Sequence, residues 1–402
     1  MRVVVVSAWE PWRTSDGAAF VLDHQLRELA GRHELTVLCA GAPRAEAAVP
    51  VAVAGRYGRA TVRWFGTSTP AGFDYLRRLL WSARRGEPAH VRFVERPGLL
   101  TAYDAAVAAG ADVVHLHGWG TAQLAERAWA KAVPAVHMAI DPWTENARNR
   151  RVAGFRAPLE RRQLERIARH EARHYAAART VAGVTDGDAE VVRRLSPRAA
   201  VEVLPNGVEP GPEPAPVSAT PPVLGFHGVY DSRANVEAAT HLVNDIWPRV
   251  RAEIPAAKVL LVGRRPNREV RRLVGSGVEL RADVPDIRAV LLEMSVHVDW
   301  MTSGAGIKNK VLEAMAAGRP VVASEMGARG IGGVLVAADT DVAAARIVRL
   351  LRDPAALRAA GETARAQVVA NFSWAANARH LEQLWQRAAG RPVGDDRSGS
   401  WR

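Results

Sequence analysis

Residues 295–325 read SVHVDWMTSGAGIKNKVLEAMAAGRPVVASE and join an apolar run to a loop of small residues, a helical pattern and a second apolar run. Five residues of this segment suit an anionic or sugar ligand: Gly304, Gly306, Lys308, Lys310 and Glu313. A loop of small residues that leads into a helix exposes backbone N–H groups and the positive end of the helix dipole. Lysines there suit phosphate, and a carboxylate within the helix suits sugar hydroxyls. The segment therefore predicts a strand, a loop and a helix that together bind a nucleotide.

The alternation of apolar runs and helical patterns continues along the rest of the chain. Strand-like runs precede the segment at Arg2–Ser7, Glu34–Cys39, Val113–His117, Ala135–Met138, Thr180–Val184, Val201–Leu204, Val223–His227, Lys258–Val262 and Val278–Arg281. Helical patterns such as Ala18–Gly31 lie between these runs, although residues 40–110 predict little beyond a helix at Asp74–Arg84. Short buried strands that alternate with helices predict parallel sheets covered on both faces.

Two such sets of elements are separated by residues 207–222, GVEPGPEPAPVSATPP, whose prolines favour a linker. The sequence thus predicts an α/β fold with two doubly wound Rossmann-like domains, 1–206 and 223–372. We expect the domains to face each other across a cleft at the carboxyl ends of their strands. A helix at 373–390 follows, and we expect residues 391–402 to form a disordered tail.

Composition excludes several classes of protein. Cys39 is the only cysteine among 402 residues, which excludes an internal disulfide and a cysteine metal cluster. The longest run without Asp, Glu, Lys or Arg, residues 214–230, contains four prolines and does not suit a membrane-spanning helix. The apolar run Val3–Val6 is too short for a signal peptide. We therefore expect a cytoplasmic protein.

The chain has a formal net charge of +12, which raises the question of a nucleic-acid or membrane partner. Of 54 basic residues only four are lysines: Lys131, Lys258, Lys308 and Lys310. An arginine-rich chain with abundant alanine, glycine and proline is typical of a GC-rich genome, and no nucleic-acid-binding motif accompanies the charge. We expect no nucleic-acid partner. Two of the four lysines lie in the one loop where a point charge would meet phosphate.

Two motifs imitate other chemistries. Gly304-Ala305-Gly306, with Glu325 after the next strand, resembles a dinucleotide fingerprint, but Asn309 occupies the place of the third glycine and the unit lies late in the chain. An NAD(P)-binding oxidoreductase is therefore the less favoured interpretation. Asp186-Gly187-Asp188 resembles a metal-binding pair of aspartates, yet it begins a helix, where capping is the better explanation. No other cluster has convincing metal-ligand spacing.

Three further features are candidates for binding. His115 and His117 lie on the same face at the end of a predicted strand and precede a glycine turn. Gly17 follows the first strand, where the backbone could approach a ligand at a helix start. The arginine-rich stretch Arg148–Arg173 is by default a solvated helix face, and the alternative is a peripheral contact with an anionic acceptor or membrane.

At these residues the chain resembles the retaining family 4 glycosyltransferases of the GT-B architecture. The strongest stretch is GIKNKVLEAMAAGRPVVAS at 306–324, whose IKNK sequence resembles one branch of that family. Supporting segments are DVVHLHG at 112–118, VLPNGV at 203–208, GFHGVYDSRANV at 225–236 and the helix at 372–385. The resemblance extends from residue 1 to about residue 390.

The resemblance implies that a sugar passes from a nucleotide diphosphate donor to an acceptor hydroxyl with retention of configuration and without a metal or other cofactor. Residues 1–206 would form the acceptor-side domain and 223–372 the donor domain, with the helix at 373–390 crossing back to the first. The acceptor would be a natural product or a cell-envelope glycan, and the enzyme would be cytoplasmic or peripheral at the inner membrane face. A nucleotide-sugar-binding partner subunit without activity of its own is the principal alternative.

The resemblance also assigns roles to residues. Glu313 would bind the donor ribose, and the backbone at Gly304, Gly306 and Ile307 would contact the donor sugar and diphosphate. His117 would lie beside the reacting sugar as a catalytic group, and Gly17 would let the first-domain loop approach the diphosphate.

Some positions depart from the family pattern. Ala305 occupies the place of the first of two glutamates, and Val229 and Ala234 occupy the places of an arginine and a lysine. We hypothesise that Lys308, Lys310 and the neighbouring Arg233 bind the diphosphate instead, and that Lys310 and Arg233 act in catalysis.

Overall fold

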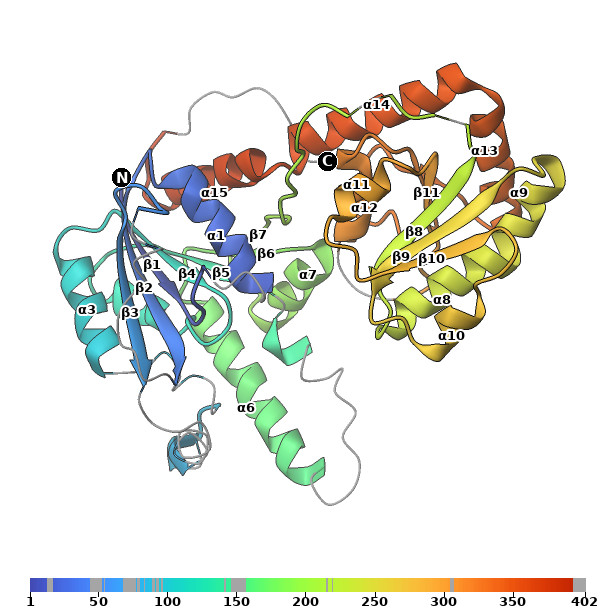
Figure 1. Ribbon diagram of the computed structural model, residues 1–402. Coiled ribbons are helices and arrows are strands. Elements are labelled where there is room, and N and C mark those ends of the chain that lie inside the picture. The colour runs from blue at the N-terminus through green and yellow to red at the C-terminus, as the bar shows by residue number, and fades with distance from the viewer. Residues whose placement is uncertain are drawn as a thin grey trace. The chain divides into compact units, whose positions relative to one another are not determined.

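The computed structural model describes residues 1–12, 17–43, 53, 55–67, 77, 80–82, 84–88, 91, 94, 97–140, 142–145, 157–214, 216–218, 220–303 and 307–392. Gly304, Gly306 and most of the helix expected at Asp74–Arg84 lie outside these residues. The chain divides into two compact units, one of Met1–Pro205 with Asn377–Arg402 and one of Asn206–Ala376. Each unit is an α/β sandwich with a wholly parallel sheet (Figure 1).

The first unit contains a seven-stranded sheet in the order β3-β2-β1-β4-β5-β6-β7. Its strands are β1 (Arg2–Ser7), β2 (Glu34–Pro43), β3 (Thr61–Thr67), β4 (Val113–His117), β5 (Ala135–Ala139), β6 (Thr180–Gly183) and β7 (Val201–Val203). Its helices are α1 (Gly17–Leu29), α3 (Pro97–Ala108), α4 (Leu124–Trp129), α6 (Ala157–Tyr175), α7 (Asp186–Leu195) and α15 (Trp374–Ala388), which enters this unit at Asn377.

Strand β1 shows why this sheet is covered on both faces. Val3 and Val5 join a core with α1 and α15, whereas Val4 and Val6 join a second core with α3 and α4. Side chains of a strand alternate between faces, so a run of valines can bury both. Figure 1 shows α1 and α15 side by side, and Gln25 Nε2 on α1 donates a hydrogen bond to Asn377 Oδ1 on α15 at 3.0 Å.

The second unit contains a six-stranded sheet in the order β10-β9-β8-β11-β12-β13. Its strands are β8 (Val223–Val229), β9 (Lys258–Arg264), β10 (Val278–Ala282), β11 (Val296–Asp299), β12 (Val321–Ala323) and β13 (Leu335–Val336). Its helices are α8 (Arg233–His241), a π-helical turn at Leu242–Ile246, α9 (Trp247–Glu253), α10 (Arg268–Arg272), α11 (Ile287–Leu291), α12 (Asn309–Ala316), α13 (Thr340–Arg352) and α14 (Pro354–Asn371). Val296 and Val298 of β11 face the core formed with α8, α9 and α13, while α12 packs in a separate core.

The predicted fold class is confirmed: both units are doubly wound parallel sheets with helices on their two faces. The predicted strands all appear, most of them with bounds within two residues of those expected. Strand β3 and helix α3, in the stretch 40–110, were not predicted. In β3, which lies at the sheet edge, Thr61, Arg63 and Thr67 interrupt the apolar residues, so this strand lacks the continuous apolar run of a buried parallel strand.

The proline-rich segment 207–222 is attached to the second unit by Arg365 of α14. The Arg365 guanidinium donates hydrogen bonds to the carbonyls of Pro210 and Gly211 and lies 3.1 Å from the Glu213 carboxylate. Val208 pairs with Ser373 as an isolated bridge. Among the described residues, no helix is both long enough and apolar enough to cross a membrane.

The packing of α15 predicts a stability difference. Leu381 is buried in the core beneath α15, so Leu381→Ala should lower the free energy of unfolding by about 2–5 kcal/mol through lost burial and a cavity. Urea unfolding monitored by circular dichroism measures this change. Arg379→Ala, at an exposed position of the same helix, should change it by less than about 0.5 kcal/mol. Equal effects of the two substitutions would show that α15 is not packed as described.

Candidate active site

The second sheet has one place where a ligand would be expected from topology alone. Its strand order reverses at β8, because β9 and β10 extend to one side and β11, β12 and β13 to the other. Loops that follow β8 and β11 leave in opposite directions at this point, and ligands of doubly wound sheets bind there, outside the carboxyl ends of the strands. Residues 300–308 follow β11 and lead into α12.

Helix α12 begins at this edge without a side-chain cap. Lys308 is the N-cap residue, and its side chain accepts no hydrogen bond from the first turn. Val311, Leu312 and Met315 bury one side of the helix against the sheet and fix its direction. Among the described residues, the N–H of Val311 donates to the Lys308 carbonyl, so the N–H groups of Asn309 and Lys310 and the positive end of the dipole remain for an anion.

Lys310 lies in the first turn of α12 and is largely buried. Its Nζ donates to Asn235 Oδ1 on α8, lies 5.0 Å from the centre of the Phe226 ring and stands 4.0 Å from the carboxylate of Asp299 at the end of β11. Burial lowers the pKa of Lys310, and the charge of Asp299 opposes that change. We call Asn235, Asp299, Lys308 and Lys310 the lysine cluster.

Lys308 is the second cation of the lysine cluster, with an exposed fraction of only 7%. Burial lowers its pKa, Asp299 raises it, and the neighbouring charges of Lys310 and Arg329 lower it further. Two ammonium groups at a helix N-terminus repel one another and the dipole, so this arrangement favours binding of an anion with more than one negative charge.

Glu313 lies one turn further along α12 and is held by a histidine of β8. Its Oε2 is 2.8 Å from His227 Nε2, and His227 Nδ1 is 3.0 Å from His297 Nε2 on β11. A carboxylate only accepts hydrogen bonds, so His227 donates from Nε2 to Glu313. The pKa of the fully buried His297 is well below its ordinary value because burial disfavours the charged ring. The two rings orient Glu313, whose side chain remains 40% exposed and can reach a ligand.

A second chain of hydrogen bonds ends at the start of α1 in the first unit. Trp385 Nε1 donates to His115 Nδ1 at 3.2 Å, His115 Nε2 is 3.3 Å from His117 Nδ1, and His117 Nε2 is 2.9 Å from the carbonyl of Ala18. The indole can only donate and the carbonyl can only accept, so each ring is neutral with its proton on Nε2. Burial lowers the pKa of His117 to about 4, and His117 has no exposed surface.

The structure brings together some of the predicted site residues and separates others. Ile307, Lys308, Lys310 and Glu313 lie together around the start of α12. Arg233 does not join them by any contact of the described residues: it is 71% exposed and pairs with Glu237 and Glu269. Gly17 and His117 belong to the first unit, and a Cβ added to Gly17 would meet no atom within 4 Å.

Three residues of the site were not singled out from the sequence. Asn235 lies two positions after Arg233 and, unlike Arg233, reaches Lys310. His227 and Asp299 interrupt the apolar runs of β8 and β11, and a polar group in a buried strand was the signal that could have identified them. Alternation places both side chains, with His297, on the sheet face that α12 covers.

The motif Asp186-Gly187-Asp188 serves as a helix cap, as predicted. Thr185 is the N-cap residue of α7, its hydroxyl accepts from the backbone N–H of Asp188, and the Asp188 carboxylate accepts from the backbone N–H of Thr185. This reciprocal pair is a capping box.

One group of potential metal ligands, which the sequence spacing did not reveal, lies beside α6. Ligand atoms of Glu87, His170 and His174 are within 4.8 Å of one another. His170 Nδ1 is 2.8 Å from Glu87 Oε2, and His174 Nδ1 is 3.0 Å from Glu126 Oε1. These pairs fasten α6 to its neighbours.

Of the arginine-rich stretch Arg148–Arg173, the part from residue 157 belongs to α6, and its contact with a membrane or acceptor stays a prediction.

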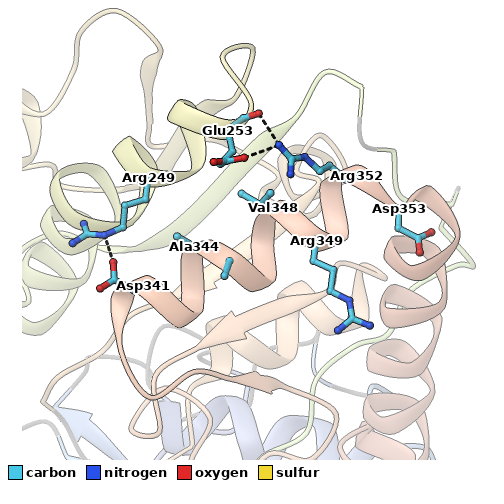
Figure 2. A pocket seen from close by; sticks show the side chains of 9 residues that line it. Arg249, Glu253, Asp341, Ala344, Val348, Arg349, Arg352 and Asp353 are labelled. Atoms are coloured by element: carbon cyan, nitrogen blue, oxygen red, sulfur yellow. Dashed lines mark hydrogen bonds and ion pairs between the residues drawn. The ribbon is translucent and has the colours of Figure 1, made fainter.

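Two surface hollows of the second unit lie away from the lysine cluster. One of about 710 Å³ lies between α9 and α13, and Figure 2 shows two pairs among its charged side chains, Arg249 with Asp341 and Glu253 with Arg352. Another of about 580 Å³ lies where β8, β9 and β10 begin. Neither is at the carboxyl edge of the sheet, where doubly wound folds bind their ligands.

Comparison with known families now identifies the chain. Residues 15–211 match the family Glycosyltransferase Family 4, and residues 221–353 match the family Glycosyl transferases group 1. The two matches together span most of both units, and the chain belongs to these glycosyltransferases. It is a glycosyltransferase enzyme and not a nicotinamide-dependent oxidoreductase. No curated protein sequence matches it.

Solved structures share the fold at low sequence identity. HepE of Anabaena in complex with UDP has 14% identity and a TM-score of 0.62, covering 96% of this chain and 100% of that one. α,α-Trehalose 6-phosphate synthase of Burkholderia multivorans has 14% identity and a TM-score of 0.58, covering 97% and 99%. A glycosyltransferase of Rickettsia africae has 11% identity and a TM-score of 0.57, covering 96% and 98%. The chain therefore has the GT-B fold.

The buried histidines of the first unit predict acid sensitivity. Burial lowers the pKa of His117 and of His137 from 6.5 to about 4, so the unfolded chain binds protons first as pH falls. The contribution of each ring to the free energy of unfolding is complete above about pH 6.5 and is lost towards pH 4, at about 1.4 kcal/mol per ring for each pH unit between its unfolded and folded pKa values. The free energy of unfolding by urea, measured at several pH values, tests this.

His137→Gln removes one such ring and should make the dependence on pH shallower. His241→Gln, at a partly exposed position of the second unit, should leave it unchanged. A dependence that is the same in the His137 variant and the wild type would contradict the assignment of His137 as a buried neutral ring.

Proposed function

We propose that this chain transfers a glycosyl group from a nucleoside diphosphate sugar to an acceptor hydroxyl with retention of configuration. The observation that supports this most is the uncapped N-terminus of α12 with Lys308, Lys310 and Glu313 at the strand-order reversal. A diphosphate fits the two cations and the helix end, while a carboxylate one turn away fits the ribose hydroxyls.

The lysine cluster would act on the leaving group. Breaking the glycosidic bond leaves additional negative charge on the diphosphate, and cations that are already in place stabilise that charge without reorganisation. Lys310 is held by Asn235 and Asp299 before any ligand arrives. In this proposal no metal is needed, and the acceptor hydroxyl loses its proton to the departing phosphate on the same face of the sugar.

The remaining predicted residues have more limited parts in the proposal. Glu313 binds the ribose in the orientation that His227 imposes. His117 keeps its place beside the sugar in the family pattern, and its hydrogen bond to Ala18 supports a role in fixing the start of α1, next to Gly17. Arg233 pairs with two glutamates, so a part in diphosphate binding requires that these pairs break.

The choice of donor follows from the structural neighbours. HepE of Anabaena was solved with UDP and with UDP-glucose, so UDP-sugars are the first donors to test. The IKNK-type loop, with Lys308 and Lys310, is proposed to define the diphosphate site of this chain. A hydroxyl of a natural product or of a cell-envelope glycan is the proposed acceptor class.

Lys310→Ala should lower kcat about 10²–10³-fold, because it removes a preorganised charge that stabilises the leaving diphosphate. Release of UDP from a UDP-sugar, with or without acceptor, is the measurement. Lys258→Ala is the matched control, since Lys258 is exposed at the opposite end of the sheet, where β9 begins. Turnover by the Lys310 variant equal to that of the wild type would refute the role of Lys310.

Glu313→Gln should raise the KM for the donor at least about tenfold with a smaller change in kcat, since a charge-assisted hydrogen bond to the ribose becomes a neutral one. Glu325→Gln is the control, because this exposed glutamate follows β12 and has no part in the proposed donor site. An equal rise in KM with the Glu325 variant would contradict the role of Glu313.

Assays of donor turnover also distinguish the proposed enzyme from a second candidate function. Ala305 and Val229 stand where the family has a glutamate and an arginine, which favours a nucleotide-sugar-binding subunit that requires a partner. That alternative predicts that the isolated chain binds UDP-sugars in a thermal-shift assay yet neither hydrolyses nor transfers them. Donor turnover by the isolated chain would exclude it.

A further inference from the structure

Asp299, the last residue of β11, is a buried carboxylate in the middle of the lysine cluster. Its exposed fraction is 0%, and neither carboxylate oxygen has a hydrogen-bond partner of ordinary geometry among the described residues. The nearest cation is Lys310, whose Nζ is 4.0 Å from Oδ2. Gly327 packs against the same group, since a Cβ added to Gly327 would lie 2.8 Å from Asp299 Oδ1.

A buried charge of this kind is costly. Removing a carboxylate from water costs several kcal/mol unless hydrogen bonds and an opposite charge compensate, and here the compensation comes mainly from charge, with a smaller contribution from the backbone N–H of Met301. Burial accordingly raises the pKa of Asp299, while Lys310 and Lys308 lower it. Buried carboxylates whose pKa is perturbed by burial and by a charged neighbour cluster at functional sites.

The charges around Lys310 come from several elements. Those in its surroundings are Asp299 and the neutral His297 of β11, His227 of β8, and Lys308 and Glu313 of α12, with Arg329 beyond Lys308. Asn235 of α8 adds a neutral oxygen. Asp299 is the only fully buried anion of this group, and Glu313 is directed to His227.

We propose that Asp299 is a positioning residue that keeps Lys310 protonated and directed towards the diphosphate site. Asp299 lies beneath the lysines, has no exposed surface and does not touch the ligand. Two lysines lie above one buried carboxylate, Glu313 is directed to His227 and Arg329 lies beyond Lys308, so the helix end keeps an excess of positive charge. This excess holds a diphosphate, whereas the lysines alone would repel each other and lose a proton. The inference rests on the donor role proposed for Lys310.

The test measures Lys310 directly and needs no ligand. Full-length protein labelled with ¹³C at lysine Cε gives four side-chain resonances, because the chain has only Lys131, Lys258, Lys308 and Lys310. Lys308→Arg and Lys310→Arg assign the two of interest. In Asp299→Asn the titration midpoint of Lys310 should fall by about one pH unit or more, since an opposite charge at about 4 Å is lost.

Asp245→Asn is the matched control, because Asp245 is only half-buried and pairs with His241 in the same unit. The Lys310 midpoint should be the same in this variant as in the wild type. A midpoint unchanged by Asp299→Asn would overturn the proposal, and so would equal changes in the two variants.

A reciprocal measurement keeps the proposal testable if Asp299→Asn does not fold. In Lys310→Met the carboxyl carbon of Asp299, observed by ¹³C labelling of aspartate, should titrate at higher pH than in the wild type, because a compensating cation is gone. If the titration midpoint of Asp299 is the same in Lys310→Met as in the wild type, the two groups are not coupled.

UDP binding, measured by calorimetry across the alkaline range, completes the test. Only protonated Lys310 attracts the diphosphate, so wild-type affinity should fall as pH rises through the Lys310 midpoint. In Asp299→Asn this fall should begin at lower pH by the shift seen in the spectra. If the wild type does not bind UDP, the proposed donor is wrong, while the lysine and aspartate titrations still decide the coupling. If UDP binds with the same pH profile in both proteins, Asp299 is not a positioning residue.

Discussion

A parallel strand can be joined to its neighbour only by a crossover that passes over a face of the sheet, and this constraint governs both units of the protein. Helices must cover both faces, and the sheet grows outward from its first strand in two directions. At β8 and β11 the connections diverge, so the carboxyl ends of these two strands are left for loops. The connection from β11 to α12 starts there for this reason. Its chemistry depends on which side chains of β8 and β11 lie near the carboxyl ends of these strands.

Strands β8 and β11 place buried polar side chains, as well as backbone groups, next to α12. His227, His297 and Asp299 share the face under α12, in positions that apolar side chains would ordinarily occupy. The two imidazoles form a hydrogen-bonded chain that ends at Glu313 and orients its carboxylate. Asp299 acts differently, since its carboxylate is compensated mainly by the charges of Lys310 and Lys308. The first unit contains a similar hydrogen-bonded chain, with Trp385, His115 and His117 linking α15, β4 and the start of α1.

How far the sequence predicts this structure depends on whether a pattern is local. Apolar runs predicted most strands of both sheets, because a strand buried on both faces must be apolar along its whole length. The edge strands β3 and β13 were not predicted, since polar residues interrupt β3 and β13 has only two residues. Lys308, Lys310 and Glu313 lie close together because one helix start carries all three. Arg233 was a plausible partner in sequence, yet its side chain follows the i,i+4 spacing of α8 to Glu237.

The sequence by itself determined the class of fold and the family, and it located the segment proposed to bind an anion, since each depends on residues close together in the chain. Only the tertiary structure decided which charges lie around Lys308 and Lys310. Asn235 and Lys310 are separated by 75 positions, and His227 and Glu313 by 86. No local periodicity encodes such pairs, because they arise from the order in which strands assemble in a sheet. The protonation state of a buried lysine is likewise a property of the assembled charges, and it cannot be predicted from the residue or its neighbours in sequence.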